Sequence, residues 1–200
     1  MKERPVIFNG EMVRAILDSR KTQTRRVMKP QPEPCYRGGH WWPSNTFKTM
    51  LHIEEQMQNG AGGWGGLAGY ACPFGAVGDR MWVRETFGDC GNRLVYRADT
   101  EDGAASQVKR WVPSIHMPRE ACRILLEITA VRVERLNDIS EEDAKAEGVK
   151  AGVSPGYEHM MHQVAFSELW QSIYGAENWS ANPWVWVIEF KHVEVRDASK

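Results

Sequence analysis

The sequence predicts an α+β fold in which a small mixed β-barrel is decorated by helices and carries a long loop-rich insertion. Segments with the period of a strand outnumber segments with the period of a helix, and the two kinds do not alternate. This order disfavours a doubly wound parallel sheet. The longest strand also changes phase in its middle, as a bent barrel strand does. Neither a repeat nor a linker divides the chain, so we expect one domain over residues 1–200.

The composition excludes several classes of function. A net charge of −1 excludes a strongly basic protein that coats nucleic acid, so any such contact must come from a local cationic patch. No apolar run is long enough for a transmembrane helix, and the first residues, MKERPVIF, lack the apolar core of a signal peptide. We therefore expect a cytoplasmic protein with no membrane partner, either a monomer or, given nine tryptophans, a homodimer.

The cysteines are predicted to be free thiols. They are widely spaced and form no CxxC pair: Cys35, Cys72, Cys90 and Cys122. A zinc site would need ligands from across a long loop, at spacings that no zinc motif uses. His159 and His162 lie three residues apart, but no third ligand accompanies them. We therefore predict neither a metal nor a cofactor.

The chain begins with a short strand and an amphipathic helix. Residues Pro5–Phe8 form an apolar run suited to a strand, and Asn9 is a good N-cap for a helix. The helix should end near Ser19 or Arg20, which delivers the following residues into a turn or a strand. Its apolar residues recur at helical spacing on one face: Met12, Val13, Ile16 and Leu17.

The segment SRKTQTRR, which follows this helix, is the densest chemical motif of the sequence. A buried amine can lose its proton, a threonine can act as a nucleophile, and guanidinium groups suit phosphate or carboxylate. The alternative is that the basic residues only stabilise the negative end of the helix dipole. The cationic and hydroxyl-bearing members of the segment after its first serine are Arg20, Lys21, Thr22, Thr24, Arg25 and Arg26.

Residues 30–75 are predicted to be an insertion within the domain. Pro30, Pro32 and Pro34 prevent a regular helix, and the later run GAGGWGGLAG lacks the spacing of a phosphate-binding loop. Loops of this length are usually functional or disordered. We expect either a lid that folds over the site or a partly ordered loop.

A strand over Arg80–Phe87 places an acid and a base on opposite faces. Side chains alternate along a strand, so Arg84 and Glu85 point to opposite sides. At least one of them is then directed into an interior or a cleft, unless both reach solvent at the end of the strand. Both are therefore candidate binding residues.

Further strands follow in the second half of the chain. Leu94–Arg97 is a short strand, and the alternation over Arg123–Leu136 is the clearest strand signal in the sequence. Its phase slips near Thr129–Ala130, which indicates a bulge or a sharp bend. The last strand, Trp184–Phe190, is continuously apolar and should be buried on both faces.

Two helices are predicted between these last strands. Ser140 with Asp143 three residues later resembles a capping box, so we expect a short helix from Ser140 to Glu147, closed by Gly148. A second helix is expected over residues 158–174, because apolar residues recur there at helical spacing and a glycine follows.

The motif after the first helix resembles the ASCH domain family, whose fold is similar to that of the PUA RNA-binding domain. The family pattern is G-x-K-x-x-[E/T]-x-R, and this sequence matches it at Lys21, Thr24 and Arg26, with Ser19 in place of the glycine. Glycine adopts a positive φ more easily than serine, so this departure affects the turn. The resemblance implies a PUA-like barrel.

Other segments carry the same resemblance. These are the Gly78–Asp79 turn, the strand Ile124–Val133 and the closing Val185–Phe190. The resemblance spans about residues 5–28 and 74–194, which leaves the stretch between them as an insertion. The runs WVRETF and NPWVWVIEF are similar to those of ASCH proteins commonly encoded by phages and prophages.

Small bacterial ASCH proteins include amidohydrolases that remove the acetyl group from N4-acetylcytidine. The resemblance implies a catalytic set of Lys21 and Thr24 in the motif, with Glu147 in the helical segment after the long strand. It also implies a modified nucleoside or RNA as the partner. The residues that we expect to contact this partner are Arg20, Arg25, Arg26, Arg84 and Glu85.

Three functions remain open on the sequence. In a hydrolase, Lys21 takes the proton of Thr24, and Glu147 orients the amine or protonates the leaving group. This requires a turn that brings Lys21 and Thr24 together, because an extended strand would place them on opposite faces. The second function is a non-catalytic module that binds RNA or a modified nucleotide in an open basic groove. The third is a ribonuclease, in which the same cations stabilise a phosphorane.

Overall fold

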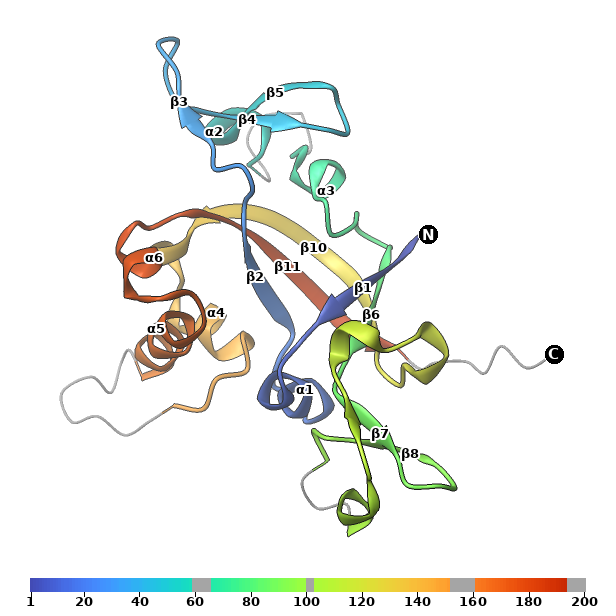
Figure 1. Cartoon of the computed structure of the whole chain (residues 1–200). Helices are drawn as coiled ribbons and strands as arrows, with labels where there is room; N and C mark the ends of the chain where they lie inside the picture. Colours follow the sequence, from blue (N-terminus) through green and yellow to red (C-terminus); the bar gives the residue numbers. More distant parts are fainter. Residues whose placement is uncertain (59–65, 100–102, 152–160, 194–200) are drawn as a thin grey trace.

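The computed structural model describes residues 1–58, 66–99, 103–151 and 161–193, which form an α+β structure with several sheets (Figure 1). The class therefore agrees with the prediction. The main sheet has five strands in the order β1-β6-β10-β11-β2, in which β1 and β6 are parallel and the other neighbours antiparallel. Its strands are β1 (Glu3–Ile7), β6 (Arg80–Arg84), β10 (Leu125–Arg135), β11 (Trp184–Val193) and β2 (Gln23–Val27).

The two edge strands of this sheet, β1 and β2, are not joined by a backbone ladder in the described part of the chain. A side chain bridges them instead, since Arg26 Nη2 donates a hydrogen bond of 2.9 Å to the carbonyl oxygen of Ile7. The expected barrel is therefore a curved sheet that backbone hydrogen bonds do not close. Helix α1 (Gly10–Leu17) connects the two edge strands in the chain, since it follows β1 and leads through a turn into β2.

The long strands β10 and β11 form the centre of the sheet and arch across the molecule (Figure 1). Their antiparallel register shifts between Ile128 and Ala130, where the sequence predicted a bulge or a bend. A bulge bends the strand and increases its twist, which accounts for the curvature of the pair. The first five residues of β11 are all buried, so the prediction of a strand buried on both faces is confirmed.

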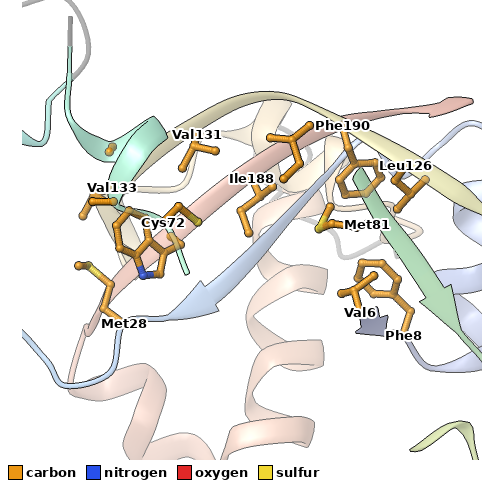
Figure 2. Close-up of a cluster of buried hydrophobic side chains, with 14 of the residues drawn as sticks. Val6, Phe8, Met28, Cys72, Met81, Leu126, Val131, Val133, Ile188 and Phe190 are labelled. Carbon is orange, nitrogen blue, oxygen red and sulfur yellow. The ribbon is translucent and has the colours of Figure 1, made fainter. Parts of the chain in front are cut away.

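The main hydrophobic core lies along one face of this curved sheet. Figure 2 shows its side chains as a continuous layer, from Met28 and Cys72 at one end to Phe8 and Leu126 at the other. Trp186 has no exposed surface in this layer, and Trp184 is also buried. The four cysteines are free thiols, as predicted.

The stretch predicted to be a loop-rich insertion contains regular structure and belongs to the core. It forms a three-stranded antiparallel sheet, whose Trp42 stacks edge-on against Trp186 with ring centroids 5.3 Å apart. This sheet was not predicted, because its strands are short and prolines occur in and before them. The helices and strands of this stretch are β3 (Glu33–Pro34), β4 (His40–Ser44), β5 (Thr49–His52), α2 (Ile53–Gln56) and α3 (Ala68–Ala71). Residues 59–65 of the glycine-rich run lie outside the described residues.

The predicted strand over Arg80–Phe87 is divided into two. Strand β6 ends at Arg84, and β7 (Phe87–Asp89) starts a second three-stranded sheet with β8 (Leu94–Tyr96) and β9 (Trp111–Val112). Short 3-10 segments follow in the same region and before α4: η1 (Gly103–Gln107), η2 (Ser114–His116), η3 (Arg119–Ala121) and η4 (Leu136–Asp138).

Capping residues begin two helices where the sequence predicted them. Asn9 Oδ1 accepts a hydrogen bond from the Met12 amide at 2.8 Å at the start of α1. Ser140 Oγ accepts one from the Asp143 amide at 3.0 Å at the start of α4 (Glu141–Ala146). Both contacts satisfy amides that have no partner inside the helix.

The last two helices cover the opposite side of β10 and β11 from the insertion (Figure 1). They are α5 (Met161–Tyr174), which Gly175 follows, and α6 (Ala176–Ser180). Residues 158–160, with which the predicted helix begins, lie outside the described residues, and so does His159. A second hydrophobic cluster joins these helices to the sheet, and its buried members are Leu136, Ile139, Ala144, Phe166, Trp170, Val185 and Val187. No helix within the described ranges combines the length and the apolar character needed to cross a membrane.

Gly148 should tolerate alanine far less well than Gly78, although both have a positive φ (83° and 86°). A Cβ atom at Gly148 would lie 2.7 Å from the Cβ atom of Lys21 and 2.9 Å from that of Ala15, whereas one at Gly78 would meet no atom within 4 Å. We expect Gly78→Ala to lower the free energy of unfolding by about 1–2 kcal/mol. Gly148→Ala should cost about 1–3 kcal/mol more, because of overpacking. Urea denaturation measures both losses, and equal losses would contradict the packing described here.

Candidate active site

The turn after α1 delivers the basic motif to the edge of the sheet. The helix ends at Leu17, and Ser19 adopts the left-handed conformation with φ 58°. The amides of Arg20 and Lys21 then both donate to the carbonyl oxygen of Ala15, at 2.8 and 2.9 Å. Ser19 thus occupies the backbone region that glycine reaches at least cost, at the position where the ASCH pattern has glycine.

Lys21 and Glu147 form a buried contact through both backbone and side chain. The two residues make an isolated antiparallel bridge. Lys21 Nζ donates to Glu147 Oε2 at 2.8 Å and to the Glu147 carbonyl oxygen at 2.9 Å, and the Lys21 side chain has no exposed surface. Burial lowers the pKa of Lys21, and the Glu147 carboxylate opposes part of this effect, while the charges of Arg26 and Arg25 add to it.

Arg25 shares the same carboxylate from the other side. Its Nη1 donates to Glu147 Oε1 at 3.1 Å, and its Nη2 donates to Glu134 and Asp143, each at 3.0 Å. The Arg25 side chain has no exposed surface, although the residue is among those that line the smaller of the two cavities described below. Glu147 therefore lies between an amine and a guanidinium, which satisfy one carboxylate oxygen each.

Thr24 lies on the other face of β2 from Arg25. Thr24 pairs with Ile188 of the main core, whereas Arg25 pairs with Val187 of the second cluster. Side chains alternate in this way because β2 is extended, and the helix has already ended before Lys21. Helix α1 therefore does not place Lys21 and Thr24 on one face, and no hydrogen bond joins the two side chains among the described residues. Thr24 is 3% exposed, and its hydroxyl makes no hydrogen bond to the part of the chain that the structure describes.

A cavity of about 210 Å³ brings Thr24 and Glu147 to one wall. Thr24, Arg26 and Glu147 supply polar groups to it, and helix α5 supplies most of its apolar lining. A larger cavity of about 450 Å³ between α1 and α5 is also lined by Glu147, so that Glu147 stands where the two meet. The aromatic residues of the smaller cavity are Phe166, Trp170 and Tyr174.

Arg26 lines the smaller cavity, whereas Arg20 lines the larger one. The Arg26 guanidinium lies 5.3 Å from the centroid of the Phe8 ring, and its buried Nε has no hydrogen-bond partner among the described residues. Arg20 is about one-third exposed and donates to the Gly148 carbonyl oxygen at 2.7 Å and to Asp18 at 2.9 Å. Arg26 therefore places a guanidinium at the smaller cavity, whereas Arg20 binds the chain just after α4.

Arg84 and Glu85 belong to a separate cluster. Glu85 is buried and receives two hydrogen bonds of 2.9 Å from Arg123, which also binds Asp99 at 2.7 Å. Burial raises the pKa of Glu85 and Arg123 opposes this effect, while Arg84 Nε donates to the carbonyl oxygen of Met117. Within the described ranges no hydrogen bond or ion pair joins this cluster to Lys21 or Glu147. The structure therefore does not bring these two candidates to the cavity.

The acids and the second arginine around Arg25 were not predicted from the sequence. The sequence predicts only a capping role for Asp143, but its carboxylate also binds Arg132 at 2.8 Å. Arg132 and Glu134 are two positions apart on β10 and therefore share a face, which is the one signal that the sequence contained. In the described part of the chain, no group of three His, Cys, Asp or Glu residues is arranged to hold a metal ion.

No family model matches the sequence, and no curated protein matches it. Among solved structures, the chain is similar to a crystal structure of protein EF3133 from Enterococcus faecalis, described with the family model DUF984. The identity is 10% and the TM-score is 0.42, with 100% of this chain and 86% of that chain covered. A likeness at this TM-score supports no conclusion about fold or function.

Removing the Glu147 charge should destabilise the protein more than removing that of Lys21. Glu147→Gln leaves the buried Lys21 amine without its counter-charge, and we expect a loss of about 3–5 kcal/mol at pH 7. Lys21→Met leaves Glu147 paired with Arg25, so the loss should be smaller. Chemical denaturation measures both, with Glu142→Gln on the exposed surface of α4 as the control. Equal losses in the two variants would contradict the shared carboxylate.

Asp143→Asn should destabilise the protein at neutral pH and much less in acid. Burial alone would raise the pKa of Asp143, but the charges of Arg132 and Arg25 outweigh it and hold the pKa below its usual value of 3.8. A carboxyl with a depressed pKa contributes stability above its unfolded pKa and loses it as the pH falls through the folded pKa. We expect a loss of about 1–3 kcal/mol at pH 7. A difference from wild type that does not shrink between pH 5 and pH 2.5 would exclude this ion pair.

Proposed function

We propose that this chain is an ASCH-type protein with a PUA-like fold, and that it hydrolyses the amide of N4-acylated cytidine-type substrates. The observation that carries the proposal is the buried Lys21–Glu147 contact of 2.8 Å at a cavity that Thr24 also lines. An amine of lowered pKa, a carboxylate and a hydroxyl are the groups that amide hydrolysis requires.

The fold supports the first half of the proposal. The motif residues Lys21, Thr24 and Arg26 lie at the edge of a curved sheet whose long strand is bulged. A PUA-like barrel would need the seam between β1 and β2 to be closed, and the Arg26–Ile7 hydrogen bond bridges that seam. The cavity that holds Thr24 opens beside this contact, since Ile7 and Arg26 both line it.

In the proposed reaction, the Thr24 oxygen attacks the carbonyl carbon of the acyl group. Lys21, in its neutral form, receives the proton of the hydroxyl. The carbon–N4 bond of the tetrahedral intermediate then breaks, and N4 takes back the proton that Lys21 had received and leaves as the cytosine amine. Water cleaves the remaining threonine ester and releases the carboxylic acid. Since no hydrogen bond joins the Lys21 amine to Thr24 among the described residues, a water molecule or closure on the substrate must connect them.

The cavity supplies groups that would recognise the base. Trp170 and Tyr174 have ring centroids 4.5 Å apart and offer an aromatic surface for stacking. Arg26 lines the cavity, and its guanidinium would bind the carbonyl oxygen of the pyrimidine or of the acyl group. A volume of about 210 Å³ is below the roughly 300–1,000 Å³ of pockets for drug-sized ligands, and suits a base with a short acyl group.

The alternative functions need exposed cations, and the structure gives less support to them. An RNA-binding groove or a ribonuclease site would place several guanidinium or ammonium groups at the surface. Arg25 and Lys21 have no exposed side-chain surface, and Arg20 is paired with Asp18. A nucleoside pocket therefore agrees better with this arrangement than an open basic groove does.

The test is turnover of N4-acetylcytidine, followed by the loss of the acetyl group. We expect Thr24→Val, which keeps the shape of the side chain but removes its hydroxyl, to lower kcat at least about a hundredfold. Thr24→Ser is the matched control and should retain measurable activity. Lys21→Met and Glu147→Gln should also lose activity, once each is shown to be folded by circular dichroism.

Two negative results would each exclude a part of the proposal. No turnover by the folded wild-type protein would exclude this substrate. Equal activity in Thr24→Val and wild type would exclude the proposed nucleophile. A titration with RNA at several salt concentrations then tests the binding module, whose affinity should fall steeply as salt is added.

A further inference from the structure

Arg25 is the most thoroughly buried cation beside the proposed catalytic groups, and the proposed reaction gives it no role. Its guanidinium spans three carboxylates: Nη1 reaches Glu147 at 3.1 Å, and Nη2 reaches Glu134 and Asp143 at 3.0 Å. The guanidinium is a rigid planar fork, so holding one end on two acids fixes the direction of the other end. The hydrogen bonds to Glu134 and Asp143 therefore also set the position of Nη1 relative to Glu147.

Arg132 holds the same acids from the opposite side. Its Nη2 binds Asp143 at 2.8 Å, its Nε donates to Glu134 and its Nη1 donates to Glu189. The acids that bind Arg25 come from β10 and from α4 with its C-cap, and Arg132 connects two of them to β11 through Glu189. Arg132 is more exposed than Arg25, with 22% of its side chain accessible. The charged groups around Lys21 and Glu147 are thus Arg25, Arg26, Arg132, Glu134, Asp143 and Glu189.

The sharing of Glu147 has a consequence for Lys21. In the hydrolysis proposed above, the amine must lose a proton and regain it. If Lys21 were the only partner of Glu147, each loss would leave a buried carboxylate unpaired, which is strongly unfavourable. Arg25 keeps one carboxylate oxygen paired throughout, because a guanidinium remains charged.

We propose that Arg25 is a positioning residue that keeps Glu147 paired in both protonation states of Lys21, so that the amine can exchange a proton inside a buried site. This role rests on the proposed hydrolase function for its use in turnover. Its effect on Lys21 does not depend on the identity of the substrate. The like charge of Arg25 and its share of the carboxylate both favour the neutral amine.

The test uses two independent readouts on the full chain, comparing wild type with Arg25→Gln. The first is the pH titration of the Lys21 ¹³Cε signal in lysine-labelled protein, assigned by its absence in Lys21→Met. The second is kcat and KM for N4-acetylcytidine over the same pH range. We expect Arg25→Gln to move the Lys21 midpoint to higher pH, because a positive charge and a competitor for Glu147 are removed. We also expect it to lower kcat by about ten- to hundredfold, with KM changed less than about twofold.

Conservative and control variants separate this role from simple stability. Arg25→Lys restores the charge but not the fork, so it should recover part of kcat and of the midpoint. Arg135→Gln is the matched control, because Arg135 is a partly buried arginine of β10 that stacks on Trp184 outside the cluster. It should leave both readouts unchanged.

The outcomes distinguish the two proposals. A folded Arg25→Gln protein whose Lys21 midpoint is unchanged would overturn the role of Arg25, whatever the activity. Absence of turnover in wild type together with a shifted midpoint would support the role of Arg25 and exclude N4-acetylcytidine as the substrate. If Arg25→Gln does not fold, Arg132→Gln replaces it, since it loosens Asp143 and Glu134 and should produce a smaller upward shift. No shift in that folded variant would overturn the proposal.

Discussion

The buried contact between Lys21 and Glu147 is the constraint on which the rest of the candidate site depends. The Thr22 amide donates to Ala146 beside it, so the chain after α1 and the end of α4 are joined through their backbones as well as their charges. Gly148 approaches Lys21 closely, and only a residue without a side chain fits there. The two cavities that meet at Glu147 exist because this contact fixes α1 and α4 at the sheet edge while α5 packs across from them.

Among the described residues, the buried carboxylates each bind an arginine side chain. Glu147 is shared by two cations, and Arg25 in turn serves three acids. The separate charged cluster around Glu85 follows the same principle, since Arg123 binds both Glu85 and Asp99 with paired hydrogen bonds. Burying a carboxylate is tolerable when each oxygen has a donor, and arginine supplies such donors in a fixed geometry. The two clusters differ in that only the first lies at the cavities between α1 and α5.

Features with local causes could be predicted from the sequence, whereas those that depend on distant segments could not. The cap at Asn9 and the bulge in the long strand follow from residues a few positions apart. The partnership of the basic motif with the end of α4 came from the ASCH resemblance, because no spacing rule relates residues so far apart. The acids around Arg25 come from elements that meet only in the folded chain. The burial of Trp42 could not be predicted for the same reason. The prolines near it in the sequence indicated a loop, whereas its burial depends on contact with the distant Trp186.

The order of strands in the main sheet has a consequence for how the chain folds. Strand β2 pairs with β11, which lies near the end of the described chain. Strand β1 pairs with β6, and the whole three-stranded insertion separates the two in the sequence. Pairings between such distant segments carry a high loop-closure cost and make folding slow. During synthesis the edge at β2 must wait, unpaired, for almost the entire described chain to emerge from the ribosome. The segment that carries Lys21 and Thr24 is therefore made long before the strand that completes its surroundings.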